Sequence, residues 1–218
     1  MDDSHLLLLL DGEEPVRELV ISLLLSTSSV IATDGAARYA ERQGIELATI
    51  IGDMDSIPKD LRDKYSATGI RIIEEPDQFS NDFEKALRYI LSERVSRNVV
   101  VLGIHGKRTD HLLTNLSVMQ RFTDQFDSLI AYDATHRHHI LTSKKNRYEF
   151  DLPLQSRISV TPLPEAIGVT THGLYYPIVD ELMTFGKREG LGNIITDENA
   201  SVEIKNGALL ISVPYTIR

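Results

Sequence analysis

VIATDGAARYAERQGIELATIIGDMDS, residues 30–56, holds two apolar runs with a segment of helical spacing between them. The runs Val30–Thr33 and Leu47–Ile51 are rich in β-branched and other apolar residues, which predicts two strands. The segment from Ala36 to about Gln43 predicts a helix, and Gly44 is placed to end it. A strand, a helix and a second strand in this order indicate a βαβ crossover between parallel strands. We therefore expect an α/β fold.

The same alternation runs through residues 1–135. Short apolar runs predict further strands at Leu6–Leu10, Ile70–Ile73, Val99–Leu102 and Leu129–Tyr132. Helical spacing predicts helices at Pro15–Leu25, after Pro58, at Asn81–Arg94 and at Asp110–Phe122. We expect one domain over residues 1–135, with a mostly parallel sheet and helices on both faces.

The pattern changes after residue 136. Stretches such as ISVTPLP (158–164) and ASVEIKNGALLISV (200–213) alternate β-branched and polar residues and contain turn signals. Residues 136–218 thus predict a smaller antiparallel β-sandwich domain, with helical spacing only at Asp180–Thr184. The polar stretch THRHHILTSKKNR (135–147) is expected to be a solvated junction between the domains rather than a histidine metal site.

Composition excludes several classes of function. The 218 residues include no cysteine, which rules out disulfides, thiolate zinc sites and a cysteine nucleophile. The formal net charge of −9 argues against a general nucleic-acid binder. No apolar run reaches the ~18 residues of a membrane span, and the leucine run at Leu6–Leu10 has acidic flanks, unlike a secretory signal. With no targeting signal visible, we expect a cytoplasmic protein.

Polar clusters follow the predicted strands. Asp34 and Gly35 lie between a strand and a helix, where glycine permits close backbone approach and the helix N-terminus favours an anion. Asp53 and Asp55 project the same way if the backbone is extended. Such a pair either belongs to a solvated turn or holds Mg²⁺, which accepts carboxylate, water and phosphate oxygens.

Two later clusters add charge of both signs. Asp77, Asp82, Glu84 and Lys85 crowd the start of one helix, whose cap is Ser80 or Asn81. The stretch VLGIHGKRTDHLLTNL (101–116) follows a strand with two glycines and then Lys107 and Arg108, groups that suit phosphate. Its spacing satisfies neither G-x-x-x-x-G-K-[ST] nor G-x-G-x-x-G.

The carboxyl ends of parallel strands meet at one edge of a sheet, so these clusters are expected to converge. An acidic pair of the Mg²⁺-binding type beside a basic, glycine-rich loop is what nucleotide-dependent phosphoryl or pyrophosphoryl transfer requires.

The ordered motifs D-G, G-D-x-D-S, D-Q-x-x-x-D-F-x-K-A-L and L-G-x-x-G-x-R-x-D-H-x-L-x-N, followed by TTHGLYYP (170–177) and Gly192-Asn193, resemble the thiamine pyrophosphokinase family. The resemblance covers nearly the whole chain. It implies an α/β nucleotide domain followed by a β-sandwich, and a homodimer with shared thiamine sites. It also implies that the pyrophosphoryl group of ATP is transferred to the hydroxyl of thiamine, giving thiamine diphosphate and AMP, with Mg²⁺ as cofactor.

The resemblance also implies roles for single residues. Asp53, Asp55 and Asp82 would hold Mg²⁺ and the triphosphate, Arg108 would offset charge on the transferred group, and Asp110 would orient Arg108 or the acceptor hydroxyl. The residues implied on the ATP side are Asp34, Gly35, Gly52, Gln78, Asn81, Lys85, Gly103, Gly106, Lys107, Arg108 and His111. Those implied on the thiamine side are Thr171, Tyr176, Gly192 and Asn193.

The chain departs from the usual family pattern at Ala36, Phe79, Asn81, Lys107, Tyr176 and Gly192. Two other interpretations of the same residues stay open. A D-x-D motif also begins phosphatases that form an aspartyl-phosphate, in which Asp53 would be the nucleophile. The departures at Phe79 and Gly192 also allow a module that binds thiamine or a nucleotide without turnover.

Overall fold

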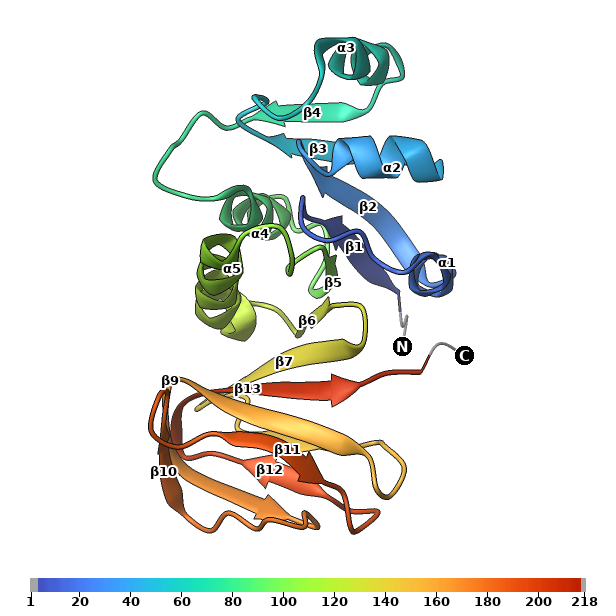
Figure 1. Cartoon of the computed structure of the whole chain (residues 1–218). Coiled ribbons are helices and arrows are strands. Elements are labelled where there is room, and N and C mark those ends of the chain that lie inside the picture. The colour runs from blue at the N-terminus through green and yellow to red at the C-terminus, as the bar shows by residue number, and fades with distance from the viewer. Residues whose placement is uncertain (1–3, 217–218) are drawn as a thin grey trace. The chain divides into compact units, whose positions relative to one another are not determined.

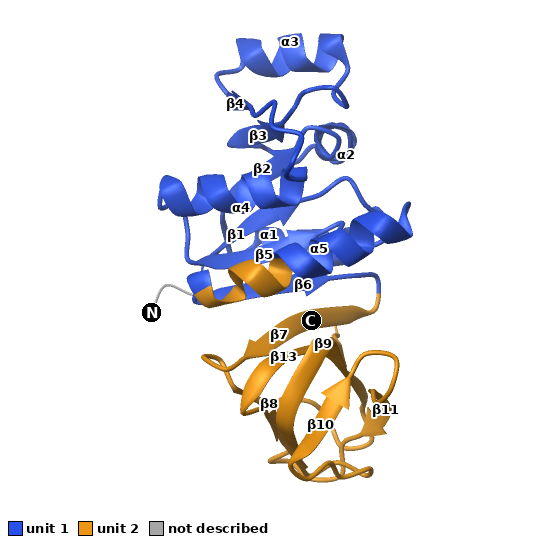
Figure 2. Ribbon diagram, turned by 90° about the vertical axis from the view of Figure 1, so that its left-hand side faces the viewer, with its two compact units in different colours: residues 1–118, 125–134, 217–218 blue, residues 119–124, 135–216 orange. Residues whose placement is uncertain are grey.

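The computed structural model describes residues 4–216, so residues 1–3 and 217–218, the ends of the two expected domains, lie outside the described residues. The described chain divides into two compact units (Figure 2). The first runs to Val118 and includes Gln125–Ala134, and the second comprises Met119–Asp124 and Thr135–Thr216.

Strands and helices alternate along the chain as far as Tyr132 (Figure 1). In order they are β1 (His5–Leu9), α1 (Arg17–Leu24), β2 (Thr27–Thr33), α2 (Ala37–Gln43), β3 (Thr49–Gly52), α3 (Lys59–Ala67), β4 (Arg71–Glu74), α4 (Asp82–Ser92), β5 (Asn98–Leu102), α5 (Thr109–Phe122), the short 3₁₀ helix Thr123–Gln125 and β6 (Ser128–Tyr132). The predicted alternation is confirmed, with ends that differ by a few residues.

The sheet of the first unit has the strand order β4-β3-β2-β1-β5-β6, and all its pairs are parallel. The chain steps from β1 outward to β4 and then returns to β5 on the other side of β1. Because crossovers of one hand place their helices on opposite faces when the direction reverses, α1 and α2 lie on one face and α4 and α5 on the other (Figure 1). The reversal between β1 and β5 is the point where such sheets bind ligands.

Burial explains why the first strand is so apolar. Leu6, Leu7, Leu8 and Leu9 are at most 2% exposed, since helices cover both faces of the strand. A strand buried on both faces is a continuous apolar run instead of an alternating one. The leucine run is therefore a central strand, as the sequence predicted.

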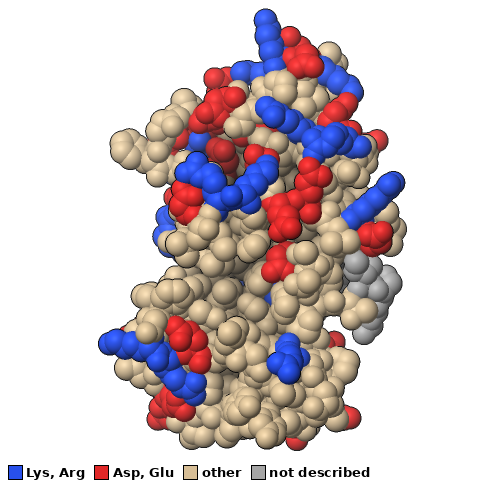
Figure 3. Space-filling view, viewed as in Figure 1, with Lys and Arg blue, Asp and Glu red and all other residues tan. Residues whose placement is uncertain are grey.

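Charge is mixed on the surface of this unit. On the face in Figure 3, acidic and basic side chains interleave over the first unit, and no single basic surface covers it. Many of these groups pair with each other, for example Arg62 with Glu74 at 2.6 Å and Arg71 with Glu93 at 3.0 Å. No helix within residues 4–216 combines the length and the apolar character that a bilayer span requires.

The second unit is built from strands β7 (His136–Thr142), β8 (Arg147–Glu149), β9 (Arg157–His172), β10 (Glu181–Thr184), β11 (Gly190–Ile194), β12 (Ser201–Glu203) and β13 (Asn206–Pro214). Neighbouring strands follow the order β7-β13-β9-β12-β8, and β10 and β11 pair with β9. All of these pairs are antiparallel. The long strand β9 thus joins both layers of a β-sandwich.

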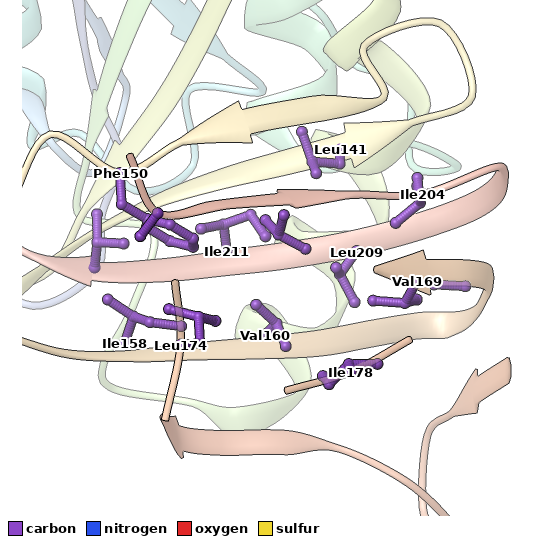
Figure 4. Packing of buried hydrophobic residues seen from close by; sticks show 14 of the residues in the cluster. Leu141, Phe150, Ile158, Val160, Val169, Leu174, Ile178, Ile204, Leu209 and Ile211 are labelled. Carbon is purple, nitrogen blue, oxygen red and sulfur yellow. The ribbon is translucent and has the colours of Figure 1, made fainter. Parts of the chain in front are cut away.

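The sandwich encloses one hydrophobic core (Figure 4). Ile158 and Val160 of β9 pack with Leu209 and Ile211 of β13, and all four are at most 1% exposed. Inward residues alternate along both strands, which is the period-2 pattern read in ISVTPLP and ALLISV. The predicted β-sandwich is confirmed.

Two local predictions are wrong. The stretch 135–147 is not a solvated junction: His136–Thr142 forms β7, which pairs with β13 along its whole length, and His139 packs on Tyr148 with ring centroids 4.8 Å apart. Asp180–Thr184 is not helical, because Glu181–Thr184 pairs with β9 and fully buries Met183. In both places strand pairing with distant residues overrides the local pattern.

His139 makes the stability of this unit depend on pH. Burial, together with the neighbouring Arg137 and His138, lowers the pKa of His139 from 6.5 to about 3. In the unfolded chain His139 therefore becomes protonated near pH 6.5, whereas in the folded chain it becomes protonated only near pH 3. As pH falls through this window, the free energy of unfolding should drop by up to about 1.4 kcal/mol per pH unit.

His139→Gln should reduce this acid sensitivity, measured by urea unfolding at pH 7.5, 6.5 and 5.5. The matched control is His172→Gln on the exposed side of β9, which should follow the wild-type curve. If the free energy of unfolding changed with pH equally in wild type and His139→Gln, the acid sensitivity would not come from His139.

Candidate active site

A cleft of about 590 Å³ lies at the carboxyl ends of the parallel strands, in the first unit. Most of the predicted nucleotide-side residues line it: Asp34, Gly35, Asp53, Asp55, Gln78, Asn81, Asp82, Lys85, Gly103, Gly106, Lys107, Arg108 and His111. Gly52 and Asp110 do not line the cleft and lie next to residues that do. A second cavity of about 460 Å³ adjoins it and shares Asp11, Asp55 and Lys107. The structure therefore brings the four strand-end clusters together.

Three carboxylates form the acidic side of the cleft. Asp34, Asp53 and Asp55 each offer an oxygen, and these oxygens lie within 4.8 Å of one another. The backbone at this point is not extended, because β3 ends at Gly52 and Met54 has a left-handed φ of 65°. The two carboxylates meet because the Asp55 N–H donates to Asp53 Oδ1 at 3.2 Å and closes a tight turn.

Glycine lets β3 approach Asp34. A Cβ at Gly52 would lie 2.7 Å from Asp34 Cγ, closer than any side chain tolerates. Gly35 donates its N–H to Asp34 Oδ1 at 2.7 Å, and Ser56 donates its N–H to Asp34 Oδ2 at 3.3 Å. Asp34 is 2% exposed, so it sits beneath the turn that carries the other two carboxylates.

The pKa of Asp34 responds to burial and to the neighbouring carboxylates. Burial and the Asp82 and Asp53 carboxylates raise the pKa of Asp34 from 3.8 to about 6, against the opposing effect of the Ser56 and Gly35 N–H groups. Burial likewise raises the pKa of Asp82, in spite of its bond to Lys85 at 3.0 Å. Such a cluster is costly without a positive charge.

Asp53 differs from its two neighbours. Although burial acts to raise the pKa of Asp53, hydrogen bonds from Asp55 and Gln78 outweigh it and leave that pKa below its usual value. Gln78 Nε2 lies 3.2 Å from Asp53 Oδ2. The turn before α4 is thereby tied to the carboxylate cluster.

The loop after β5 forms the basic side. Gly103, Gly106 and Lys107 all have positive φ angles, 75°, 92° and 56°, which fold the loop tightly. Arg108 Nε donates to Asp110 Oδ1 at 3.0 Å, and a second guanidinium nitrogen reaches the other carboxylate oxygen. This contact raises the pKa of Arg108, lowers that of Asp110, and fixes the plane of the guanidinium.

The sequence analysis missed residues of the cleft that follow β1. Asp11 accepts a hydrogen bond from Lys107 Nζ at 2.6 Å, and both Asp11 and Gly12 line the cleft. The signal was present, since Leu10-Asp11-Gly12 follows the first strand as Asp34-Gly35 follows the second. Asn115 also lines the cleft, and although it ends the motif L-G-x-x-G-x-R-x-D-H-x-L-x-N, no role was predicted for it.

The predicted thiamine residues lie in the second unit, and two of them are buried there. Asn193, 3% exposed, accepts the Tyr176 N–H at 3.0 Å and donates to the Tyr176 carbonyl at 2.7 Å. Thr171, 5% exposed, accepts the Ile178 N–H at 2.9 Å. These side chains hold the loop that carries Tyr176, a residue that is 60% exposed. Gly192 has a φ of 69° and open space where a Cβ would project.

Among the departures from the family pattern, Phe79 and Asn81 have clear surroundings. Phe79 is fully exposed, on a turn in which its N–H bonds Asp77 Oδ1 at 2.9 Å. Asn81 caps α4 by accepting the Glu84 N–H at 3.0 Å, which settles the choice between Ser80 and Asn81.

Comparison with known proteins gives one consistent result. Residues 20–131 match the family model described as "Thiamin pyrophosphokinase, catalytic domain", and residues 137–209 match "Thiamin pyrophosphokinase, vitamin B1 binding domain". "Thiamine pyrophosphokinase 2" of Arabidopsis thaliana is 32% identical over 183 residues, and "Thiamine pyrophosphokinase 1" of the same plant is 30% identical over 183. Each match covers 77% of this chain and 66% of the relative, so the chain spans just under two thirds of their length.

The fold has a counterpart of known structure. Yeast thiamin pyrophosphokinase superposes with a TM-score of 0.82 at 16% identity, covering 99% of this chain and 87% of that one. At this identity the likeness concerns the fold. Since one family model spans more than half of the described chain and a second spans most of the remainder, the chain belongs to the thiamin pyrophosphokinase family.

Proposed function

We propose that the chain transfers the pyrophosphoryl group of ATP to the hydroxyl of thiamine, giving thiamine diphosphate and AMP. The observation that carries the proposal is the cleft in which the carboxylates of Asp34, Asp53 and Asp55 face the loop bearing Lys107 and Arg108. A triphosphate needs both sides, because its charge must be offset while the transferred group is held in line. Membership of the family supports the choice of thiamine as acceptor.

The carboxylate cluster suits Mg²⁺. Its donors are oxygens only, within 4.8 Å of one another, and Mg²⁺ prefers carboxylate oxygens completed by water and phosphate. Burial and then the nearby carboxylates of Asp82 and Asp53 raise the pKa of Asp34, and a divalent cation would offset this concentration of negative charge. Asp53 and Asp55, with Asp34 beneath them, would hold the ion, and Asp82 would add its charge from the start of α4. When bound, the ion would neutralise part of the charge on the phosphates.

The residues around the cluster would bind and orient the nucleotide. Arg108, held flat by Asp110, would stabilise the charge on the moving pyrophosphoryl group. Lys107 and the backbone N–H groups of Gly103 and Gly106 would contact phosphate oxygens. Gln78, Asn81, Lys85, His111 and Gly35 would line the ATP side of the same cleft, and Gly52, next to it, would leave room for Asp34. The adjoining cavity gives room beyond the phosphates.

Thiamine would meet the second unit at Tyr176. A tyrosine face suits the cationic heterocycle of thiamine, and Tyr176, exposed and packed edge to face with the Tyr175 ring, would offer one. Thr171 and Asn193 would hold the loop that carries Tyr176 in place, and Gly192 would leave space open next to Asn193. The same unit exposes large apolar side chains at Tyr175, Val179, Leu182, Phe185 and Leu191. Exposed apolar side chains of this kind would support a homodimer with shared thiamine sites, and light scattering would measure whether the mass is that of a dimer. The cytoplasmic location stays a prediction.

The experiment that tests the function is incubation of the purified chain with ATP, Mg²⁺ and thiamine, followed by chromatography of the products. AMP and thiamine diphosphate should appear together in equal amounts. Release of orthophosphate alone would favour the aspartyl-phosphate phosphatase instead. Tight binding of thiamine and a non-hydrolysable ATP analogue without any product would favour a binding module.

Asp55→Asn should lower kcat by about 100-fold or more and weaken the dependence of rate on Mg²⁺, because one ligand charge is lost. The measurement is the initial rate as a function of Mg²⁺ concentration. Asp63→Asn, an exposed acid on α3, is the matched control and should leave both quantities unchanged. Near-normal kinetics for Asp55→Asn would refute the metal assignment.

Tyr176→Ala should raise the KM for thiamine by about 10-fold or more while the KM for ATP changes little, because only the aromatic face is removed. Tyr175→Ala removes a ring of similar exposure, 62% against 60%, that packs on Tyr176 with centroids 4.8 Å apart, and it should have a smaller effect because the Tyr176 ring remains. Equal effects of Tyr176→Ala on the KM for thiamine and the KM for ATP would contradict the proposal that thiamine binds at Tyr176.

A further inference from the structure

In the proposed function, the loops after β4 and β5 bind the same nucleotide, although these two strands lie far apart in the sheet. The acidic turn Asp77–Asp82 follows β4, and the basic loop Gly103–Arg108 follows β5. Three strands separate β4 from β5 in the order β4-β3-β2-β1-β5, which is roughly 19 Å at about 4.8 Å per strand. The chain after β4 turns back over the sheet to α4 (Figure 1). The position of the segment between β4 and α4 relative to the basic loop must therefore be fixed by contacts outside the strands.

A chain of amide hydrogen bonds joins the two loops. Asn81 Nδ2 donates to Asn115 Oδ1 at 2.8 Å, and Asn115 Nδ2 donates to the Ile104 carbonyl at 3.1 Å. Asn81 is the N-cap of α4, directly before Asp82, and Ile104 lies in the basic loop directly after Gly103. Asn115, on α5, is the link between them that belongs to neither loop.

The direction of these bonds is fixed from both ends. Asn81 Oδ1 is occupied by the Glu84 N–H, so its amide nitrogen must face Asn115. The Ile104 carbonyl only accepts, so the nitrogen of Asn115 must face Ile104. Asn115 is 9% exposed and Ile104 is 3% exposed, and a hydrogen bond shielded from water holds its geometry more firmly than an exposed one.

We propose that Asn115 is a positioning residue, which with Asn81 sets the separation between the acidic turn and the basic loop so that one nucleotide spans both. The inference rests on the proposed function. On the acidic side the bridge fixes the start of α4, where Asp82 pairs with Lys85 and where Gln78 reaches Asp53. On the basic side it fixes the loop that carries Lys107 and Arg108. No atom of Asn115 needs to contact the reacting groups.

Two variants break the bridge at different bonds. Asn115→Asp keeps the shape and the acceptor for Asn81 but replaces the donor to Ile104 with a carboxylate oxygen that repels the carbonyl. Asn81→Ser keeps a good cap for α4 and loses the donor to Asn115. Thr114→Ala, one residue away on the exposed side of α5, removes a hydroxyl that bonds the Asp110 carbonyl of its own helix at 2.9 Å and is the matched control.

Both bridge variants should lower kcat/KM for ATP by about 10- to 100-fold while the KM for thiamine stays within about 2-fold of wild type. Calorimetry with Mg²⁺ and a non-hydrolysable ATP analogue should show weaker binding by about 10-fold in both, and Thr114→Ala should match wild type. The double variant should be no worse than the worse single variant, because both act through one bridge. Simple loss of folded protein would lower kcat without changing the KM or the Kd for the nucleotide.

Folded bridge variants with wild-type analogue binding and wild-type kcat/KM for ATP would overturn the inference. If Asn115→Asp does not fold, Asn81→Ser gives the same test alone. If the wild-type protein makes no thiamine diphosphate, the proposed function fails, and analogue binding by the same variants still decides whether the bridge sets the nucleotide site.

Discussion

The close approach of β1 and β5 at their carboxyl ends is the constraint on which the site depends. A Cβ at Gly12 would lie 1.9 Å from the Gly103 carbonyl oxygen, and one at Gly103 would lie 2.2 Å from the Leu10 carbonyl oxygen. The Leu10 N–H donates a hydrogen bond to the Leu102 carbonyl at 2.9 Å, and the Glu13 N–H donates one to the His105 carbonyl at 2.6 Å. These hydrogen bonds join the loop after β1 to the loop after β5. Because neither loop leaves room for a side chain at Gly12 or Gly103, the wall of the cleft at these two positions is backbone.

Around the cleft, the topology supplies the carboxylate cluster and the basic loop from different strands. The carboxylates come from β2, β3 and the start of α4, and the cations of the basic loop come from β5. Asp11 and Lys107 reach across between the β1 and β5 loops. The result is an acidic cluster with a raised pKa at Asp34 opposite an arginine pinned by its own carboxylate. Such an arrangement destabilises the free protein and suits a ligand that carries both a metal and phosphates.

The outline of the fold and most of the cleft were predictable, because strand and helix periodicity is local and parallel strand ends share an edge. Errors came where contacts between distant residues decide the conformation. His136–Thr142 reads as a polar linker until β13 pairs with it. Asp53 and Asp55 were correctly paired, but through a left-handed turn at Met54 instead of an extended strand. Asn193 and Thr171 were expected to contact thiamine, which stays a prediction, and their side chains also hydrogen-bond the loop that carries Tyr176.

The amino-acid order alone indicates most of the strands and helices, the residue types at each strand end, and the family that the motifs resemble. It does not reveal that Asn81 and Asn115, 34 positions apart, share a hydrogen bond, or that Asp34 is buried beneath the Asp53–Asp55 turn. Those facts follow from strand order and from the way α4 and α5 pack on the sheet. Periodicity reports the face on which a side chain lies, while its neighbours on that face are set by pairing between segments far apart in the chain.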